Sequence, residues 1–391
     1  MLATGPGSRS WRRSSHRRGA LLAARALVEV RVFVPRLILG VFPGRSRFKV
    51  SRFNDLPFRA AVRVVFGVVS AVPLVRVVRS GLEESVHEGD VAVVDGKGAV
   101  TSFAGDPDRL LFARSSMKPL QATVSLSCAP LDFTDREIAV MCASHNAEPV
   151  HVETVRSLMK RAGIAEEALR CPAVRPWDEE AAAADAKKRR INSDCSGKHA
   201  GMLAASRAQR WPLDSYRKPT HPLQGQVLEA VLSVTGLESV QVGIDGCGVP
   251  VHGMPLRRLA TVYARLGTPE RWGPLEPSVR RIVGAMSAEP YMVAGRNRPD
   301  TALMEVAPNV IAKGGAEGLL CAAVLDREIG VAVKVQDGSH RAAGPALIRA
   351  LALLGVLDRD QLERLEGFAS PPVLGGGEPV GVITASFDLT S

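Results

Sequence analysis

The chain has 391 residues and a formal net charge of +10, but the charge is unevenly distributed. Residues 1–70 hold 14 basic side chains and two acidic ones, a net charge of +12, whereas the other 321 residues hold 36 basic and 38 acidic side chains, a net charge of −2. A body that binds polyanions is therefore excluded. With 46% apolar and 23% charged residues, the composition is that of a soluble fold of one large or two modest domains.

The N-terminal extension, residues 1–71, is rich in arginine and poor in acids, like a transit peptide or a basic arm. We favour a different interpretation, in which a misplaced start adds a segment that the native protein lacks. Translation would then begin at a non-ATG codon near Val72, because no second methionine precedes Met117. If the extension belongs to the native protein, we expect it to be disordered. Its most apolar run, residues 64–75, is 12 residues long and contains Pro73, too short for the roughly 20 that span a bilayer, so no transmembrane helix is expected.

The body, residues 72–391, begins and ends with strand-like sequence. Alternating apolar residues predict a hairpin over 91–103 with a turn at Asp95 and Gly96. Helical spacing follows Pro149 up to Gly163 and returns at 198–207, 256–266 and 279–287, while the charged run 178–190 predicts a solvated loop or helix. Strands are predicted at 240–244, 309–313, 319–325, 330–335 and 380–384. This order predicts an α/β fold whose sheet joins both ends of the body around an inserted helical region.

The cysteines are scattered without the close pairing of a secreted disulfide framework. A reducing cytoplasm is therefore the predicted location, and each thiol is a core residue, a ligand or a nucleophile. The six are Cys128, Cys142, Cys171, Cys195, Cys247 and Cys321.

Ser115 and Lys118 form a Ser-x-x-Lys motif at the predicted start of a helix. This spacing puts both side chains on one face, where the helix N-terminus favours a developing alkoxide. A lysine accepts a serine proton only where burial or nearby positive charge lowers its pKa. Taken alone, the motif is more often a capping serine followed by a surface lysine.

Two later motifs strengthen the catalytic interpretation. Ser144 and Asn146 form a Ser-x-Asn motif, and Lys313 begins a Lys-x-Gly motif 169 residues after Ser144. In this order the three motifs are those of serine acyl-transfer enzymes of the penicillin-recognising type. Gly314, where Thr or Ser is usual, argues against a standard β-lactamase.

Two glycine-rich turns each place a cysteine beside polar residues. The first holds Cys195, Lys198 and His199, and the second holds Asp245, Gly246 and Cys247. Such cysteines are candidates for a nucleophile or for half of a soft-metal site. A tetrahedral zinc set built from them is a looser pattern than a paired Cys-x-x-Cys motif.

Together these blocks resemble the asparaginase II family of the rhizobial, thermolabile type, from about residue 72 to the C-terminus. The resemblance does not reach residues 1–71. Residues 294–301 depart from the family pattern, with Arg296 where a small residue is more frequent and Pro299 before Asp300. We therefore expect this segment to differ in conformation or in substrate contacts.

The resemblance implies an L-asparagine amidohydrolase with a serine β-lactamase-like fold, usually a homodimer. It makes Ser115 the nucleophile with Lys118 as its partner, and Ser144 and Lys313 a second pair. It also implies an unusual zinc site at Cys195, Lys198 and Cys247, with Asp245 beside the substrate. Because only a neutral lysine binds a metal, Lys198 would then have a strongly lowered pKa.

The resulting hypothesis is that Ser115 attacks the side-chain amide of asparagine while Lys118, or the Ser144 and Lys313 pair, accepts the proton. Arg114 and Asp245 are predicted to hold the α-carboxylate and α-amino groups. Zinc, where bound, is expected to order Asp245 and the cysteine turns rather than to generate the nucleophile. The remaining predicted substrate contacts are His199, Asn146 and Gly246.

Two alternatives stay open at this stage. The first is a serine amidohydrolase or acyl-transferase that acts on another amide, such as glutamine or a peptidoglycan-type substrate. The second is a degenerate enzyme that serves as a binding protein, whose basic arm recruits nucleic acid or an anionic membrane.

Overall fold

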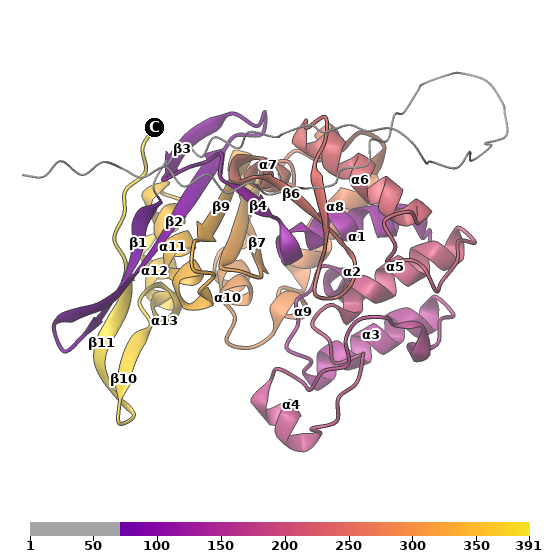
Figure 1. Cartoon of the computed structure of the whole chain (residues 1–391), viewed down its shortest axis with the longest axis horizontal. Helices are drawn as coiled ribbons and strands as arrows, with labels where there is room; N and C mark the ends of the chain where they lie inside the picture. The colour runs from indigo at the N-terminus through magenta and orange to yellow at the C-terminus, as the bar shows by residue number, and fades with distance from the viewer. Residues whose placement is uncertain (1–70) are drawn as a thin grey trace, which may run out of the picture. The chain divides into compact units, whose positions relative to one another are not determined.

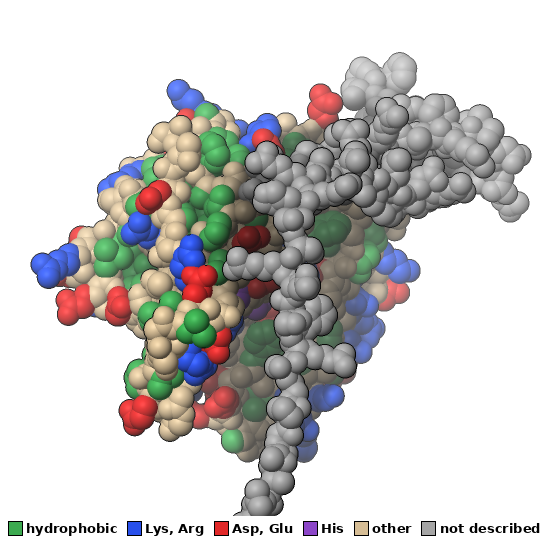
Figure 2. Space-filling view, turned by 60° about the vertical axis from the view of Figure 1, so that its left-hand side comes forward, with side chains coloured by type: hydrophobic (Ala, Val, Ile, Leu, Met, Phe, Trp, Pro, Cys, Tyr) green, Lys and Arg blue, Asp and Glu red, His purple; other side chains and the backbone are tan. Residues whose placement is uncertain are grey.

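The structure is a computed structural model and describes residues 71–391. The predictions for the basic extension therefore fall outside the described residues, except at Ala71. No helix within residues 71–391 combines the length and apolarity needed to cross a bilayer. On the face shown in Figure 2, acidic and basic side chains of the described residues are interspersed without one large patch of a single sign.

An eight-stranded antiparallel sheet joins the two ends of the body, as predicted. Its strands lie in the order β10-β11-β1-β2-β9-β8-β7, and β3 pairs with β2. β1 and β11 are antiparallel neighbours, and Val75 lies opposite Ala385 in their register. The strands are β1 (Val72–Arg79), β2 (Leu82–Val94), β3 (Val100–Ala104), β7 (Val310–Gly315), β8 (Leu319–Val324), β9 (Ile329–Val335), β10 (Pro372–Gly375) and β11 (Glu378–Ala385).

Helices cover both faces of this sheet. α7 (Leu256–Ala264) packs on β2, β8 and β9, and α11 (His340–Leu353) packs on β1, β8, β9 and β11. A side chain at Gly330 in β9 would lie 2.0 Å from the carbonyl oxygen of Ala260, so only glycine lets α7 approach so closely. Because successive strand residues face opposite sides, Val331 and Val333 point toward the α11 layer.

A helical region is inserted between β3 and β7, beside the sheet (Figure 1). Its helices form where the predicted apolar periodicity runs, and α3 starts at Pro149 and ends before Gly163. A small antiparallel sheet of β4 (Leu110–Phe112), β6 (Pro250–Pro255) and β5 (Gln241–Ile244) connects it to α7. The helices are η1 (Arg114–Met117), α1 (Lys118–Cys128), α2 (Asp135–Met141), α3 (Pro149–Arg161), η2 (Glu166–Ala168), α4 (Glu179–Ala184), α5 (Ser196–Ala208), α6 (Pro222–Thr235), η3 (Pro269–Leu275), α8 (Glu276–Ala288), α9 (Tyr291–Ala294) and α10 (Pro299–Val306).

The short turn η4 (Leu325–Arg327) connects β8 to β9. α12 (Arg359–Arg364) and α13 (Glu366–Ala369) follow α11 and precede β10. The predicted hairpin is confirmed by pairing of β2 with β3, and the predicted helices and strands all have a counterpart in the structure. The charged run 178–190 forms the short helix α4 and then a loop. The predicted α/β class, with one sheet built from both ends and an inserted helical region, is therefore confirmed.

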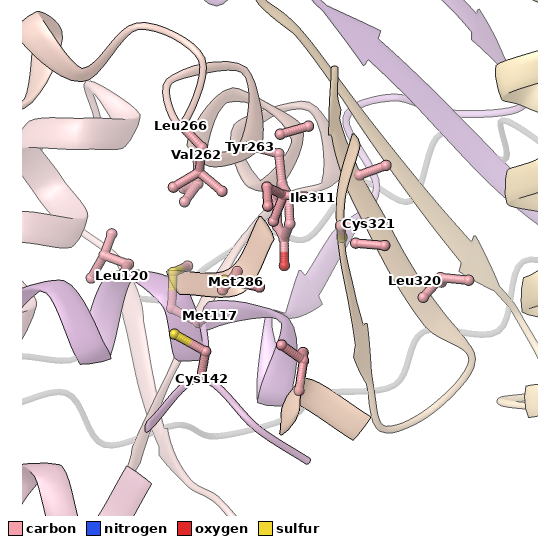
Figure 3. Close-up of a cluster of buried hydrophobic side chains, with 14 of the residues drawn as sticks. Met117, Leu120, Cys142, Val262, Tyr263, Leu266, Met286, Ile311, Leu320 and Cys321 are labelled. Carbon is pink, nitrogen blue, oxygen red and sulfur yellow. The ribbon is translucent and has the colours of Figure 1, made fainter. Parts of the chain in front are cut away.

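The hydrophobic core continues from the sheet into the helical region, directly beneath the Ser-x-x-Lys motif. Figure 3 shows side chains of α1, α7, β7 and β8 meeting around Tyr263. The buried Tyr263 hydroxyl donates a hydrogen bond of 2.6 Å to the carbonyl oxygen of Ser116. The core thus fixes the backbone turn that carries Ser115.

Candidate active site

Ser115 lies in a tight turn between β4 and α1. The backbone of Arg114 has a φ of 45°, a left-handed conformation that non-glycine residues adopt rarely and mainly where the surrounding structure imposes it. This turn puts the half-buried Ser115 on the wall of a cleft of about 580 Å³. Within the described residues, no side chain forms a hydrogen bond with the Ser115 hydroxyl, which is consequently available to a ligand.

Ser144 lies on the same cleft, in the loop that follows α2. Backbone bonds fix this loop, since the amide of Ser144 donates to the carbonyl oxygen of Val293 at 2.9 Å and that of Asn146 to Ala294 at 3.0 Å. The loop is therefore attached to the end of α9, far away in sequence.

Two buried lysines approach the Ser144 hydroxyl from different elements. Lys118 Nζ, at the start of α1, lies 2.8 Å from Ser144 Oγ, and Lys313 Nζ, on β7, lies 2.9 Å from it. The structure thus brings together Ser144, Lys118 and Lys313, and Ser115 lines the same cleft as Ser144. Lys118 bonds to Ser144 rather than to Ser115, its expected partner.

The two lysines differ in their partners. Lys118 Nζ donates to Ala143 O at 2.6 Å, to Ser144 Oγ and to Asp194 O at 3.3 Å, and the Asp194 carboxylate is 3.6 Å away. These three bonds match the three donors of an ammonium group. Lys313 has two hydrogen-bonding partners, Ser144 Oγ and Gly314 O at 2.6 Å. The carbonyl oxygen can only accept from Nζ, whereas the Ser144 hydroxyl can also donate to the lone pair of a neutral amine.

Burial makes Lys313 easier to deprotonate than an ordinary lysine. Loss of hydration, together with the positive charge of Lys118, lowers the pKa of Lys313 to about 7, and the carboxylate of Asp300 opposes this shift. A lysine near neutrality at pH 7 can both accept and return a proton. Lys313 is consequently the better general base of the two.

A second polar cluster, the thiol cluster, consists of Cys195, Lys198, His199 and Cys247. The first three lie at the N-terminus of α5, which approaches α2 so closely that a side chain at Gly197 would lie 2.0 Å from the carbonyl oxygen of Val140. Cys247 lies in the turn between β5 and β6, and Lys198 Nζ is 3.1 Å from its sulfur. The structure therefore unites the two predicted glycine-rich turns.

The thiol cluster is charged. A hydrogen bond from Cys195 and the positive charge of Lys198 hold the pKa of Cys247 far below its usual value, and the same bond raises that of Cys195. Burial opposes the charge on Lys198, but the Cys247 thiolate raises the pKa of this lysine. These shifts favour an ammonium on Lys198 and a thiolate on Cys247. Burial lowers the pKa of His199.

The donors of the thiol cluster fit a soft or borderline metal. Two sulfurs and an amine converge, and the buried His199 Nε2 beside Cys247 lacks a hydrogen-bond partner. Between residues 71 and 391 no group of three or more His, Cys, Asp or Glu side chains could hold a metal ion. A metal here would therefore need the amine of Lys198 as a ligand, together with loss of the protons from Lys198 and Cys195.

The predicted contacts of the substrate's α-groups are already bonded to one another. Arg114 Nε donates to Asp245 Oδ1 at 2.7 Å, and the amide of Gly246 donates to the same oxygen at 2.8 Å. Asn146 uses its amide group on the segment 295–298, since it donates to Arg296 O at 2.9 Å and accepts from Arg298 Nη1 at 3.0 Å. All of these bonds would need to share or exchange a partner with a bound amino acid.

Sequence reasoning missed a set of charged residues at the mouth of the cleft. Arg296 forms ion pairs with Glu148 at 3.2 Å, Asp178 at 3.0 Å and Glu180 at 2.7 Å, and so connects the starts of α3 and α4. Asp300, at the start of α10, also lines the cleft. The signal in the sequence was the departure of residues 294–301 from the family pattern.

Comparison with known proteins agrees with this geometry. The L-asparaginase II family matches residues 75–385, which is most of the chain and all of the cleft. The chain belongs to the L-asparaginase II family. The family assignment supports amidohydrolase activity and confirms the resemblance seen in the sequence. No curated protein matches the chain.

The solved structures that match are distant. A native Mglu structure has 14% identity, a TM-score of 0.38 and coverage of 70% of this chain and 67% of its own. A β-lactamase from Mycobacterium bovis has 15% identity and a TM-score of 0.33, and the match covers 69% of this chain and 95% of its own. The simvastatin synthase of Aspergillus terreus has 11% identity and a TM-score of 0.34, and the match covers 63% of this chain and 86% of its own. The β-lactamase is of the predicted fold class, but at these scores none of the three informs on activity.

Proposed function

We propose that the protein hydrolyses L-asparagine to L-aspartate and ammonia through a serine acyl-enzyme. The observation that supports this most is a cleft that holds a hydroxyl without a partner, Ser115, next to a second hydroxyl that contacts two lysines. Nucleophilic catalysis needs such a pairing of a free hydroxyl with a base that is neutral at working pH. The family membership supports the amide as substrate class.

In the proposed reaction, Ser115 Oγ bonds to the side-chain amide carbon, and its proton passes to Lys313 by way of Ser144. Lys118, held as an ammonium, offsets the negative charge that develops on oxygen. The C–N bond then breaks, Lys313 returns the proton to the nitrogen, and ammonia leaves. Water attacks the ester, Lys313 takes the proton of the water, and the Ser115 oxygen is reprotonated as aspartate departs.

The substrate's α-groups are proposed to bind at Arg114 and Asp245. Within their ion pair, Asp245 still has its second oxygen, which lies 4.0 Å from the Cys247 sulfur. An α-carboxylate would bind the guanidinium side of the pair and an α-ammonium the carboxylate side. His199, Asn146 and Gly246 complete the proposed contacts.

Zinc is part of this proposal as a resident group of the thiol cluster. Cys195, Lys198 and Cys247 would hold it, and it would supply a fixed positive charge beside Asp245. The chain's own part is to keep Asp245 next to Arg114 and to join the two cysteine turns.

A homodimer is also proposed from the family resemblance, and light scattering on the purified protein would test it. Exposed apolar side chains on the small sheet offer a surface for such contact. These are Leu110, Phe112, Val242 and Ile244.

The test is replacement of Ser115 by alanine, with ammonia release from asparagine as the assay and peptide mapping of acid-quenched enzyme as the second readout. We expect loss of turnover and of the aspartyl adduct on the peptide that contains Ser115. Ser116→Ala is the matched control, because Ser116 is buried and does not line the cleft. Unchanged turnover in Ser115→Ala would reject the mechanism.

The second test asks which amide the enzyme prefers as its substrate. A panel of asparagine, glutamine and a peptidoglycan-type peptide would measure it, since 580 Å³ is within the range of clefts that hold molecules larger than a free amino acid. Faster turnover of glutamine or of the peptide would retain the acyl-enzyme chemistry but change the substrate. No turnover of any amide, together with salt-dependent DNA binding that needs residues 1–71, would instead favour the binding-protein alternative.

A further inference from the structure

Asp300 is a buried carboxylate that lines the cleft close to Lys313. It is the second residue of α10, its side chain is 1% exposed, and it lines the cleft. Its Oδ2 accepts a hydrogen bond of 3.0 Å from the backbone amide of Gly314 and lies 3.8 Å from Lys313 Nζ. A carboxylate from a separate helix is thus fixed to the strand that carries the lysine.

Gly314 lets Asp300 approach the strand closely. A side chain at this position would begin 3.2 Å from Asp300 Oδ2, tighter than an ordinary contact. The sequence showed glycine here where Thr or Ser is usual in a Lys-x-Gly motif. In this chain, the carboxylate of Asp300 occupies the space beside the strand that a side chain at 314 would need.

The carboxylate acts on Lys313 by charge rather than by a direct bond. At 3.8 Å it is too far from Nζ for a hydrogen bond, so it accepts no N–H of the lysine. Its other oxygen, Oδ1, has no hydrogen-bond partner and lies 3.9 Å from Arg298 Nε. A buried oxygen without a partner is costly and calls for an explanation. The positive charge of Arg298 next to this oxygen supplies an electrostatic one.

Several other charged or titratable groups surround Lys313, and all act on it together. Lys118 and Arg298 favour its neutral form, and Asp194 favours its charged form. The thiols of Cys142 and Cys321 and the imidazole of His340 also face it. Of these groups, Asp300 is the one whose charge most opposes neutralisation of the lysine.

We propose that Asp300 is a positioning residue that holds Lys313 against Ser144 and sets the pH at which this lysine becomes able to accept a proton. The idea rests on the proposed function, in which Lys313 is the general base. Without Asp300, the lysine would lose its proton at lower pH and would be a weaker base in the catalytic step. With a carboxylate in direct contact, it would stay an ammonium.

The experiment measures the charge of Lys313 directly, by NMR titration of the lysine Cε signals in protein labelled with ¹³C-lysine. The chain has ten lysines, and Lys313→Met assigns the signal of interest. In Asp300→Asn, which keeps the shape and removes the charge, we expect the titration midpoint to fall by about one to three pH units. The acid limb of kcat should move in the same direction, with a reduced plateau. Asp300→Glu, which keeps the charge, should restore both toward the wild-type values.

The possible outcomes distinguish the role of Asp300 from the proposed asparaginase activity. A midpoint that stays in place or rises in folded Asp300→Asn, checked by circular dichroism, overturns the proposal, as does a midpoint in Asp300→Glu that falls as far as in Asp300→Asn. If the midpoint falls but asparagine is not hydrolysed even by the wild-type protein, the proposed function fails while the control of Lys313 by Asp300 stands.

Discussion

The site has two polar clusters that each contain buried lysine, but the pKa is lowered for Lys313 in one and raised for Lys198 in the other. In one, two lysines contact a single hydroxyl, that of Ser144; in the other, one lysine contacts a cysteine that is a thiolate. Burial lowers the pKa of Lys313 to about 7, whereas the Cys247 thiolate raises that of the equally buried Lys198. Since both lysines are buried, the neighbouring group, and not depth, decides which of them can exchange a proton at neutral pH.

His145 connects the two clusters. Its Nδ1 accepts a hydrogen bond of 3.1 Å from the Ala147 amide, so Nε2 carries the hydrogen and donates to Ser196 at 2.9 Å. Burial lowers the pKa of His145 well below its usual value. A neutral histidine therefore joins the Ser144 loop to the N-terminus of α5 without adding charge to either cluster.

The largest expected effect is that of Lys313→Met. Removal of the proton acceptor should reduce kcat by about 10² to 10⁴. Lys118→Met leaves the base but removes a positive charge that lowers the pKa of Lys313, so the acid limb that Lys313→Met abolishes should persist and move to higher pH. Equal pH profiles in the two variants would contradict the division of roles between the two lysines.

The next effect is the pH dependence of the wild-type enzyme. The base must be neutral, and the fraction of neutral Lys313 rises with pH through its pKa of about 7. We therefore expect kcat to rise about tenfold per unit at acidic pH and to level off above roughly pH 8. Stopped assays of ammonia between pH 5 and 9 measure this, and a profile that falls over the range would exclude Lys313 as the base.

The thiol cluster is tested by Cys247→Ser, with zinc content measured by mass spectrometry after dialysis. We expect the variant to lose at least 10- to 100-fold in zinc affinity, because a weak ligand replaces a thiolate. Cys128→Ser is the matched control, since the Cys128 sulfur contacts Ser127 and Gln226 and no member of the thiol cluster. Full zinc content in Cys247→Ser would remove this cysteine from the set.

The smallest effect is expected at the mouth of the cleft. Arg296→Gln removes three ion pairs around the start of α4, in which the half-exposed guanidinium meets two buried carboxylates, Glu148 and Asp178, and one exposed carboxylate, Glu180. None of these pairs reaches Lys313 or either serine, so the effect on the chemical step should be small. We expect KM for asparagine to change about two- to fivefold with kcat nearly constant. A change confined to kcat would instead connect Arg296 to the chemistry around Lys313.

Much of the fold was predictable from local pattern. The order of strands and helices followed from periodicity and from markers such as Pro149 and Gly163, and the residues of both polar clusters followed from short motifs. What could not be predicted was the long-range geometry. Nothing in the spacing of Ser115 and Lys118 shows that Lys118 turns to Ser144, because that choice depends on the carbonyl groups of Ala143 and Asp194.

The charged residues of the cleft were hidden for a similar reason. Arg296, Arg298 and Asp300 belong to no recognised catalytic motif, and their importance comes from the helix α10 that starts between β7 and the Ser144 loop. Gly314 was noticed only as a departure from a pattern. The space that glycine leaves for the Asp300 carboxylate becomes visible only where α10 packs against β7.

The pairing of β1 with β11 has a consequence for how the protein forms in the cell. A strand near the start of the body waits for one of the last segments to be synthesised before that side of the sheet is complete. Contacts of such long sequence separation slow folding, and an unpaired strand edge invites association with other chains. Nascent or C-terminally truncated chains should therefore depend on chaperones more than the finished protein does.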